Sequence, residues 1–391
     1  MDFTVASSST ENSEKAGKQV VQDFNSGKTD LIYLFASTEH ELEELVEAAS
    51  GEVDVPVIGC SSTVEVAGGA ETGSAVAAGF SDVEVGIGMR EGLDDHSYNA
   101  GKEAAREAIE DIDTDFTSYT INEEGEKERD TFVNIFADPL HGNGVHVLDA
   151  IEEELGRGYS FAGQFAGDDL SFENAYVFHD GEVVENAVVC CIVKTEGQIG
   201  SDKAHGFEET PNSFNVSEAH GSYVKALDGE RPKNVYSNLF GEENAEDPGF
   251  LLMTPFGLDL GEEEHELRVT LDVDDKGCFV CGAEVPEGEE VSLMRGEKPK
   301  LLDAAGRAAR EALDDSGLQE DNLEGALVFS CAGRHAIYDD MEKTREEVER
   351  IQEELGDTPV FGLFAFGQIA TSNGRPAFHE ETASIQVFGE K

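Results

Sequence analysis

The fold is decided by a helical stretch that occurs three times, as Glu14-Lys15-Ala16-Gly17-Lys18-Gln19-Val20-Val21, as Tyr98-Asn99-Ala100-Gly101-Lys102-Glu103-Ala104-Ala105 and as Leu302-Asp303-Ala304-Ala305-Gly306-Arg307-Ala308-Ala309. An apolar run typical of a buried strand follows each copy, at residues 31–36, 132–137 and 326–331. Similarity repeated along a chain in this way indicates repeated supersecondary units. The stretch therefore belongs to the architecture and is not a single site.

Each copy continues alike beyond its strand. An acidic helix comes first, and then a turn of small residues: Val55-Pro56-Val57-Ile58-Gly59-Cys60, Gly158-Tyr159-Ser160-Phe161-Ala162-Gly163 and Thr358-Pro359-Val360-Phe361-Gly362. We therefore predict an α/β (α+β) fold with mixed sheets, built from helix-strand-helix-turn-strand units. A degenerate fourth unit is expected over 221–286, and a surface loop at 122–125. Two units in each half would make 1–215 and 216–391 two related, pseudo-symmetric domains.

The charge of the chain predicts its environment. Its 84 acidic residues against 27 basic ones give a net charge of -57, spread along the whole sequence. Such a protein repels itself unless salt screens the charges, and at molar salt the Debye length falls to about 3 Å. We expect the cytoplasm of an extreme halophile. Without a basic stripe nucleic acid is not an expected partner, and without an apolar run of about 18 residues neither is a membrane.

Three polar residues follow the small-residue turns at corresponding places. They are Glu65, Asp168 and Gln368. Ligands often bind where equivalent turns converge and form a concave surface. These three side chains are therefore candidate ligand-binding groups, or alternatively polar residues at strand edges.

Several motifs resemble the FIST domain family, a sensory family of signalling proteins. The N-terminal motif is Pro56-Val57-Ile58-Gly59-Cys60-Ser61-Ser62, followed by Glu65. The stretch from Ala219 to Pro232 resembles the family's junction, with its Leu227-Asp228-Gly229. The C-terminal motifs are Leu327-Val328-Phe329-Ser330-Cys331-Ala332-Gly333-Arg334, Pro359 to Ile369, and Phe378-His379-Glu380-Glu381-Thr382. The resemblance covers nearly the whole chain in the family's order.

The resemblance implies a sensory module that binds a small polar metabolite, such as an amino acid, and is not an enzyme. It implies no cofactor. Because no output module is visible in the sequence, we expect the signal to pass through a separate partner protein. The chain departs from the family twice, with Gln368 in place of a glutamate and Glu380 in place of an asparagine. Exchanging an amide and a carboxylate at two positions can preserve a hydrogen-bonded pair.

Arg334 is the strongest single candidate for contact with the ligand. Its planar guanidinium can bind a carboxylate through two hydrogen bonds, and bases are scarce in this chain. The alternative is a structural salt bridge. His379 and Cys331 are further candidates, each with a structural alternative as a satisfied histidine or an inert buried thiol. Ser61 completes the predicted set.

Two other functions stay open at this point. The first is a haem-binding redox or nitric-oxide sensor, as described for some FIST relatives, which would need an axial ligand from among His141, His146, His179 and His379. The second is a hydrolase that uses Cys331 with His335 or His379, although no motif places a base beside the thiol.

The charge leads to a prediction about salt. The melting temperature should fall as KCl is lowered below about molar, because the acidic faces then repel one another with less screening. Thermal unfolding followed by circular dichroism in dilute buffer and in concentrated KCl measures this. Equal melting temperatures in the two solutions would contradict it.

Overall fold

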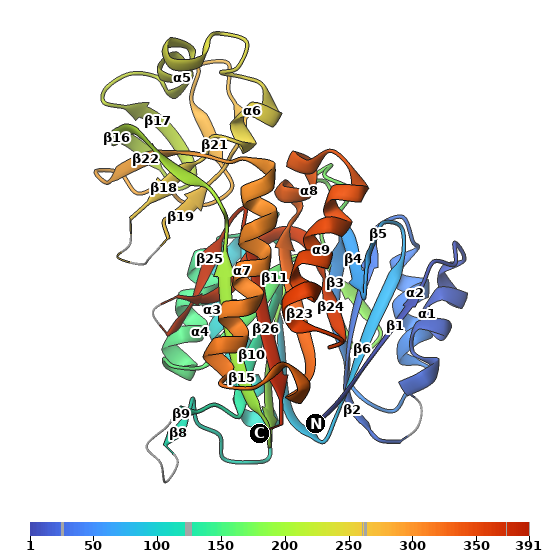
Figure 1. Ribbon diagram of the computed structural model, residues 1–391. Coiled ribbons are helices and arrows are strands. Elements are labelled where there is room, and N and C mark those ends of the chain that lie inside the picture. The colour runs from blue at the N-terminus through green and yellow to red at the C-terminus, as the bar shows by residue number, and fades with distance from the viewer. Residues whose placement is uncertain (25–26, 122–126, 260, 262–263, 373, 391) are drawn as a thin grey trace.

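A computed structural model describes residues 1–391 except 25–26, 122–126, 260, 262–263, 373 and 391. The loop expected at 122–125 therefore lies outside the described residues. The chain forms a large α/β body and a smaller β-rich domain, which stands at one end of the body at the upper left of Figure 1. The predicted α/β fold with mixed sheets is confirmed.

Three segments of the body have the same sequence of elements: strand, helix, strand, helix, strand and closing strand. The first comprises β1 (Asp2–Ser8), α1 (Ser13–Val20), β2 (Thr29–Ser37), α2 (Leu42–Ser50), β3 (Val57–Ser62) and β6 (Ala75–Ser81). The second comprises β7 (Val83–Glu91), α3 (Leu93–Asp111), β10 (Thr131–Ala137), α4 (Gly144–Leu155), β11 (Ser160–Phe165) and β14 (Ala187–Thr195). The third comprises β15 (Gln198–Ala204), α7 (Lys298–Ser316), β23 (Leu323–Cys331), α9 (Met341–Leu355), β24 (Val360–Ser372) and β26 (Ala383–Gly389), with the short α8 (Ala332–Tyr338) before α9.

The three segments also share one strand order. The orders are β1-β6-β2-β3, β7-β14-β10-β11 and β15-β26-β23-β24. In each, the last two strands are parallel and the other pairs antiparallel. The symmetry expected between two halves is not confirmed, since the connectivity repeats over three segments. The division at residue 215 stays a prediction, although the pairing of β11 with β24 joins strands from both sides of it.

Pairing between neighbouring segments closes the body. β3 pairs with β12 (Val177–His179), β11 pairs with β24, and β24 pairs with β4 (Val64–Ala67). Shorter strands extend these sheets: β5 (Ala70–Glu71), β13 (Glu182–Val184) and β25 (Arg375–His379). A separate pair is formed by β8 (Thr120–Ile121) and β9 (Lys127–Glu128). The segments are therefore joined edge to edge through β3, β11 and β24.

The repeated small-residue turn has a steric reason. A glycine in each turn lies where a Cβ atom would overlap a carbonyl oxygen of the neighbouring parallel strand: 1.8 Å from Leu34 at Gly59, 2.0 Å from Ile135 at Gly163 and 1.8 Å from Val328 at Gly362. Only glycine permits backbones to approach so closely. The three glycines thus fix equivalent registers in the three segments.

Three phenylalanines meet in the core between the segments. Phe35, Phe136 and Phe329 are buried, and each pairs with the residue that follows one of these glycines. Their ring centroids are 5.4, 6.5 and 6.2 Å apart pairwise. Aromatic contacts at such distances stabilise a core beyond the burial of area alone.

The small domain is inserted in the third segment, between β15 and α7. Its strands are β16 (Glu208–His220), β17 (Tyr223–Leu227), β18 (Phe256–Leu258), β19 (Glu266–Arg268), β20 (Thr270–Val273), β21 (Phe279–Cys281) and β22 (Glu290–Arg295), and its helices are α5 (Pro232–Phe240) and α6 (Pro248–Leu252). All pairs between these strands are antiparallel. The fourth unit expected over 221–286 is therefore wrong, and residues 248–252 of this stretch form α6.

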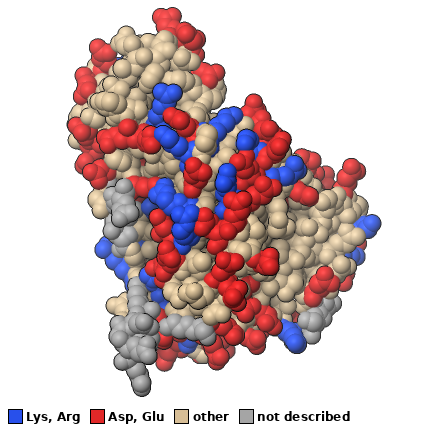
Figure 2. Space-filling view, viewed as in Figure 1, with Lys and Arg blue, Asp and Glu red and all other residues tan. Residues whose placement is uncertain are grey.

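Acidic side chains cover much of the face shown in Figure 2, as the sequence predicts. Lysine and arginine side chains gather on this face over α7, in the middle of the view. Within the described part of the chain, no helix combines the length and apolar character needed to cross a membrane.

Candidate functional site

A cavity of about 340 Å³ lies at the junction of the body and the small domain. We refer to it as the junction cavity. The body contributes residues that follow β10 and β11, the end of β23, α8, β24 and the turn after β25, whereas the small domain contributes α6, β20 and Gly282. The wall is largely apolar: Leu140, Leu170, Phe172, Leu252, Leu271, Phe366 and Phe378. Its ionisable side chains are Cys331, Glu380 and Glu381.

The topology of the body explains this position. β10 and β11 run parallel, so their carboxyl ends lie together, and β11 ends at Phe366 of the antiparallel β24, next to Ala365, where β23 ends. Ligand sites of α/β sheets commonly form there, where successive connections diverge. Loops after β10 and β11 bring Leu140 and Phe172 to the cavity, and Cys331 ends β23.

Asp168 organises the loop that follows β11. Its carboxylate accepts hydrogen bonds of 2.9–3.2 Å from the backbone N–H groups of residues 171–174 and a further one from the Ser171 hydroxyl. Burial alone would raise the pKa of Asp168, but these hydrogen bonds outweigh it and hold the pKa below its usual value. The structure therefore gives this predicted ligand residue a role in shaping the wall.

The loop held by Asp168 presents two apolar side chains to the cavity. Leu170 and Phe172 have φ angles of 71° and 55°, which non-glycine residues rarely adopt. Phe172 stacks on Phe366 of β24 with a centroid distance of 4.2 Å. Strained backbone of this kind concentrates at functional sites.

Glu380 reaches from the body to the small domain. Its carboxylate accepts a hydrogen bond of 3.1 Å from the backbone N–H of Val269. It also lies where a Cβ at Gly282 would be only 1.9 Å from its Oε1. Burial raises the pKa of Glu380 to about 7, although the nearby Arg268 lowers it.

Glu381 is the least satisfied polar group in the wall. It is 1% exposed, and its Oε2 has no hydrogen-bond partner among the described residues. Its Oε1 lies 1.9 Å from the place of a Cβ at Gly333, so a larger residue in the first turn of α8 would displace the carboxyl group of Glu381. Burial raises the pKa of Glu381 to about 8, Arg334 opposes this shift, and Glu380 adds to it.

Arg334 lies behind the wall and is fully buried. It forms an ion pair of 2.9 Å with the equally buried Glu347 of α9. Its remaining N–H groups donate to the backbone oxygens of His205, Glu381 and Leu301 at 3.0, 3.2 and 2.7 Å. Although burial disfavours its charge, Glu347 raises the pKa of Arg334. All its donors face protein groups, and this geometry favours the structural alternative over the ligand contact.

Cys331 lines the junction cavity as an uncharged thiol. Burial raises its pKa to about 12, which opposes a thiolate nucleophile. The two histidines considered as its base have other partners: His335 with Thr344 at 2.8 Å and His379 with Ser372 at 3.2 Å. Of the histidines considered as axial haem ligands, none is among the described residues that line the cavity.

The remaining predicted residues bond inside the body. With its amide oriented to satisfy its neighbours, Gln368 accepts from the Cys331 backbone N–H at 3.2 Å and from Gln164 at 2.9 Å. Ser61 accepts from a backbone N–H at 3.1 Å.

Glu65 accepts hydrogen bonds of 2.6 Å from the Ser62 hydroxyl and 2.9 Å from the Ser74 backbone N–H. Burial raises its pKa to about 7, and these bonds lower it. Glu65 and Ser61 are not part of the junction cavity as described. Their ligand-binding role stays a prediction.

Sequence reasoning missed the carboxyl group of Glu381 and the apolar wall. Glu381 stands in the quoted motif Phe378 to Thr382, next to the noted departure at Glu380. The sequence pattern that could have indicated this site is a pair of adjacent carboxylates beside an apolar strand. Burying such a pair costs free energy, so its presence in a buried turn suggests a function.

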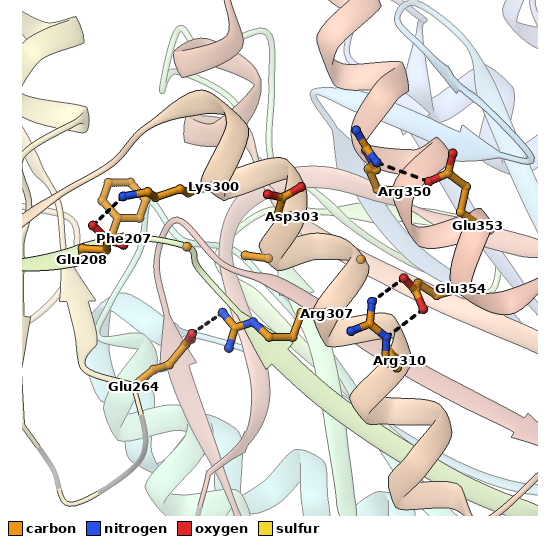
Figure 3. Close-up of a pocket in the computed structure, with 13 residues that line it drawn as sticks. Phe207, Glu208, Glu264, Lys300, Asp303, Arg307, Arg310, Arg350, Glu353 and Glu354 are labelled. Carbon is orange, nitrogen blue, oxygen red and sulfur yellow. Dashed lines mark hydrogen bonds and ion pairs between the residues drawn. The ribbon is translucent and has the colours of Figure 1, made fainter.

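A second hollow follows α7 on the surface, and its lining is polar (Figure 3). At about 490 Å³ it is larger than the junction cavity. Its bases are each paired with an acid: Lys300 with Glu208, Arg307 with Glu264, Arg310 with Glu354 and Arg350 with Glu353. Exposed pairs of this kind contribute little to stability, and salt screens them. The junction cavity, with its largely apolar wall, is therefore the candidate site.

Comparison with known families agrees with the motifs. The FIST N domain matches residues 30–230, and the FIST C domain matches residues 233–371. The chain belongs to the FIST family. FIST domains are a sensory family, so the general class of function expected from the motifs is confirmed.

One curated relative is an uncharacterized protein of Methanocaldococcus jannaschii, 23% identical over 217 residues. The match covers 51% of this FIST chain and 40% of the relative, so the chain spans less than half of that protein.

Two solved structures are similar over nearly the whole chain. A cyanuric acid hydrolase from A. caulinodans covers 100% of this chain and 99% of its own, at 8% identity and a TM-score of 0.42. Phosphoribosylformylglycinamidine synthase II from Thermotoga maritima covers 99% and 71%, at 11% identity and a TM-score of 0.21. The expectation that the chain is not an enzyme is contradicted by the match to a hydrolase and is withdrawn. At this level of similarity the match assigns no reaction to the FIST chain.

The buried carboxyls predict how stability depends on pH. Burial raises the pKa values of Glu65, Glu380 and Glu381 to about 7, 7 and 8 in the folded protein. Their contribution to the free energy of unfolding is complete below the pKa that a glutamate has in the unfolded chain, and it is lost as pH rises through the raised values. The free energy of unfolding should fall between about pH 5 and pH 9, by up to about 1.4 kcal/mol per pH unit for each group. Denaturation in concentrated KCl measures it. Glu381→Gln should flatten the profile and exposed Glu44→Gln should not; identical profiles for all three proteins would refute this assignment.

Arg334 predicts a second effect on stability. Arg334→Met should lower the free energy of unfolding by about 3–5 kcal/mol, because it leaves Glu347 buried and unpaired. The double variant Arg334→Met/Glu347→Met should recover part of the loss. Chemical denaturation at constant KCl is the measurement, and a single variant as stable as the wild type would show that the pair is dispensable.

Proposed function

We propose that this FIST chain is a ligand-binding sensory module of a salt-rich cytoplasm, with its ligand in the junction cavity and its signal passed to a separate partner protein. The observation that carries the proposal is the cavity itself. It lies between the repeated body and an inserted domain, and both contribute to its wall.

The size and lining of the cavity support a small molecule as the ligand. Pockets for small ligands have volumes of about 300–1,000 Å³ and mostly apolar walls with a few converging polar groups. The junction cavity has about 340 Å³, apolar side chains from several elements, and two carboxyl groups on one turn. A ligand with an apolar part and a polar end matches this distribution.

The wall argues against a free carboxylate on the ligand. No lysine, arginine or histidine is among the described residues that line the cavity. Arg334, the nearest candidate from the sequence, is occupied by Glu347 and by backbone oxygens. The amino acid expected from the family resemblance would therefore bury its carboxylate without a partner, which is costly.

The small domain supplies a route for the signal. It is joined to the body through the chain segments between β15 and β16 and between β22 and α7, and Glu380 contacts it through Val269. A ligand that touches both parts favours one relative arrangement over others to the extent that it binds that arrangement more tightly. A partner that recognises the small domain and the body together would then sense occupancy.

A thermal-shift screen of small molecules in concentrated KCl tests the proposal. A ligand at one hundred times its Kd should add about 2.7 kcal/mol to the free energy of unfolding. Ala336 of α8 lines the cavity, so Ala336→Phe should fill it and abolish the shift. Half-buried Ala48 of α2 is the matched control, and Ala48→Phe should retain the shift. If every stabilising compound acts equally on both variants, the junction cavity is not the site.

A further inference from the structure

The free oxygen of Glu381 is an unfilled position for a hydrogen-bond donor. The side chain is buried, lines the junction cavity, and leaves Oε2 without a partner in the described part of the chain. A buried carboxyl oxygen without a partner costs free energy that a bound donor would recover. The residue also holds a φ of 53°, so the surrounding structure keeps it in a disfavoured conformation beside Gly333.

The charges around the cavity do not balance. Two buried guanidinium groups are nearby, and each already has a carboxylate: Arg334 pairs with Glu347 at 2.9 Å and Arg268 with Glu266 at 3.0 Å. The carboxyl group of Glu380 interacts only electrostatically with Arg268, and that of Glu381 with Arg334, and among the described residues neither carboxyl group forms a direct ion pair with them. Glu380 accepts a hydrogen bond from the Val269 N–H, whereas Oε2 of Glu381 has no partner among the described residues. When Glu381 ionises, the charge that balances it must be positive, and no lysine, arginine or histidine among the described lining residues supplies it.

The aromatic side chains of the wall indicate that the cation also has an apolar part. Phe366 and Phe378 line the cavity together with Phe172, which stacks on Phe366. Aromatic faces bind apolar groups and also attract cations. A hydrated metal ion would leave this surface without contacts, but an organic cation would cover it.

We propose that the junction cavity binds a small amphipathic amine in its protonated form, with the ammonium group on the carboxyl group of Glu381 and the apolar part against Phe366 and Phe378. This inference rests on the proposed sensory function and names the class of its ligand. The ligand proposed here is an amine without a carboxylate, in place of the amino acid that the family resemblance implies.

Binding should be linked to the ionisation of Glu381. The groups that face it are Glu380 on the same turn, Cys331 at the end of β23, Arg334 on α8 and Glu347 on α9. Because burial and Glu380 raise the pKa of Glu381 to about 8, the empty site holds a proton at neutral pH. The bound ammonium would stabilise the carboxylate, so the proton leaves to solvent. Affinity should then rise with pH from about 6 to about 9 and level off above the pKa.

Calorimetric titration of the full chain with 2-phenylethylamine in concentrated KCl is the test. We expect saturable binding, release of about one proton per ligand near pH 7 when buffers of different ionisation enthalpy are compared, and affinity that increases with pH. Glu381→Gln should weaken binding by about 10- to 100-fold and abolish proton release. Asp202→Asn is the matched control, because Asp202 is another carboxyl whose pKa burial raises, to about 6, and which lies outside the cavity lining, and it should change neither.

Isosteric probes distinguish the outcomes. Binding of 2-phenylethanol, 3-phenylpropanoate or phenylalanine as tight as that of the amine would overturn the inference, as would unchanged binding by Glu381→Gln. If 2-phenylethylamine and other amines fail while another compound stabilises the wild type and not Ala336→Phe, the amine class is refuted and the sensory function stands. If no compound distinguishes Ala336→Phe from Ala48→Phe, the proposed function fails as well.

Discussion

The buried ion pair between Arg334 and Glu347 is the interaction on which the junction depends. Arg334 also donates to His205, where the chain leaves for the small domain, and to Leu301, where α7 begins after its return. A third bond, to the Glu381 backbone, fixes the turn that carries the free carboxyl. One side chain thus holds both ends of the insertion and the polar end of the cavity. Such a buried group is costly to remove, because its partners would be left unpaired.

The inserted small domain makes the third segment differ from the other two, and the junction cavity lies where this domain meets the body. In the first and second segments the opening strand passes to its helix without a domain between them, as from β1 to α1. In the third, the small domain intervenes and covers the carboxyl ends of the neighbouring parallel strands. The three segments share glycine positions and a phenylalanine cluster, which stabilise the body. The site therefore follows from the point at which the repeat is interrupted.

The repeated helix and the small-residue turn were sufficient to predict the α/β units, because close strand packing requires glycine at Gly59, Gly163 and Gly362. The small domain was not predictable in the same way, since its short antiparallel strands lack the repeat, and Phe250 belongs to a helix. For the site, Cys331 lines the cavity and its ligand-binding role stays a prediction, whereas the sequence left ligand contact and salt bridge open for Arg334 because its partner Glu347 lies on another helix. Tertiary structure decides which residues from distant segments form ion pairs. It therefore also decides which carboxyl group has no ion-pair partner.

The central claim is that Arg334 is committed to the junction and leaves Glu381 as the group that binds the ligand. A crystal structure of the full chain grown in concentrated KCl with 2-phenylethylamine tests it most directly. We predict the ammonium nitrogen within hydrogen-bond distance of the Glu381 carboxyl group, the ring against Phe366 and Phe378, and the ion pair of Arg334 with Glu347 intact. A ligand bound to Arg334, or density confined to the groove along α7 with the junction cavity empty, would contradict it.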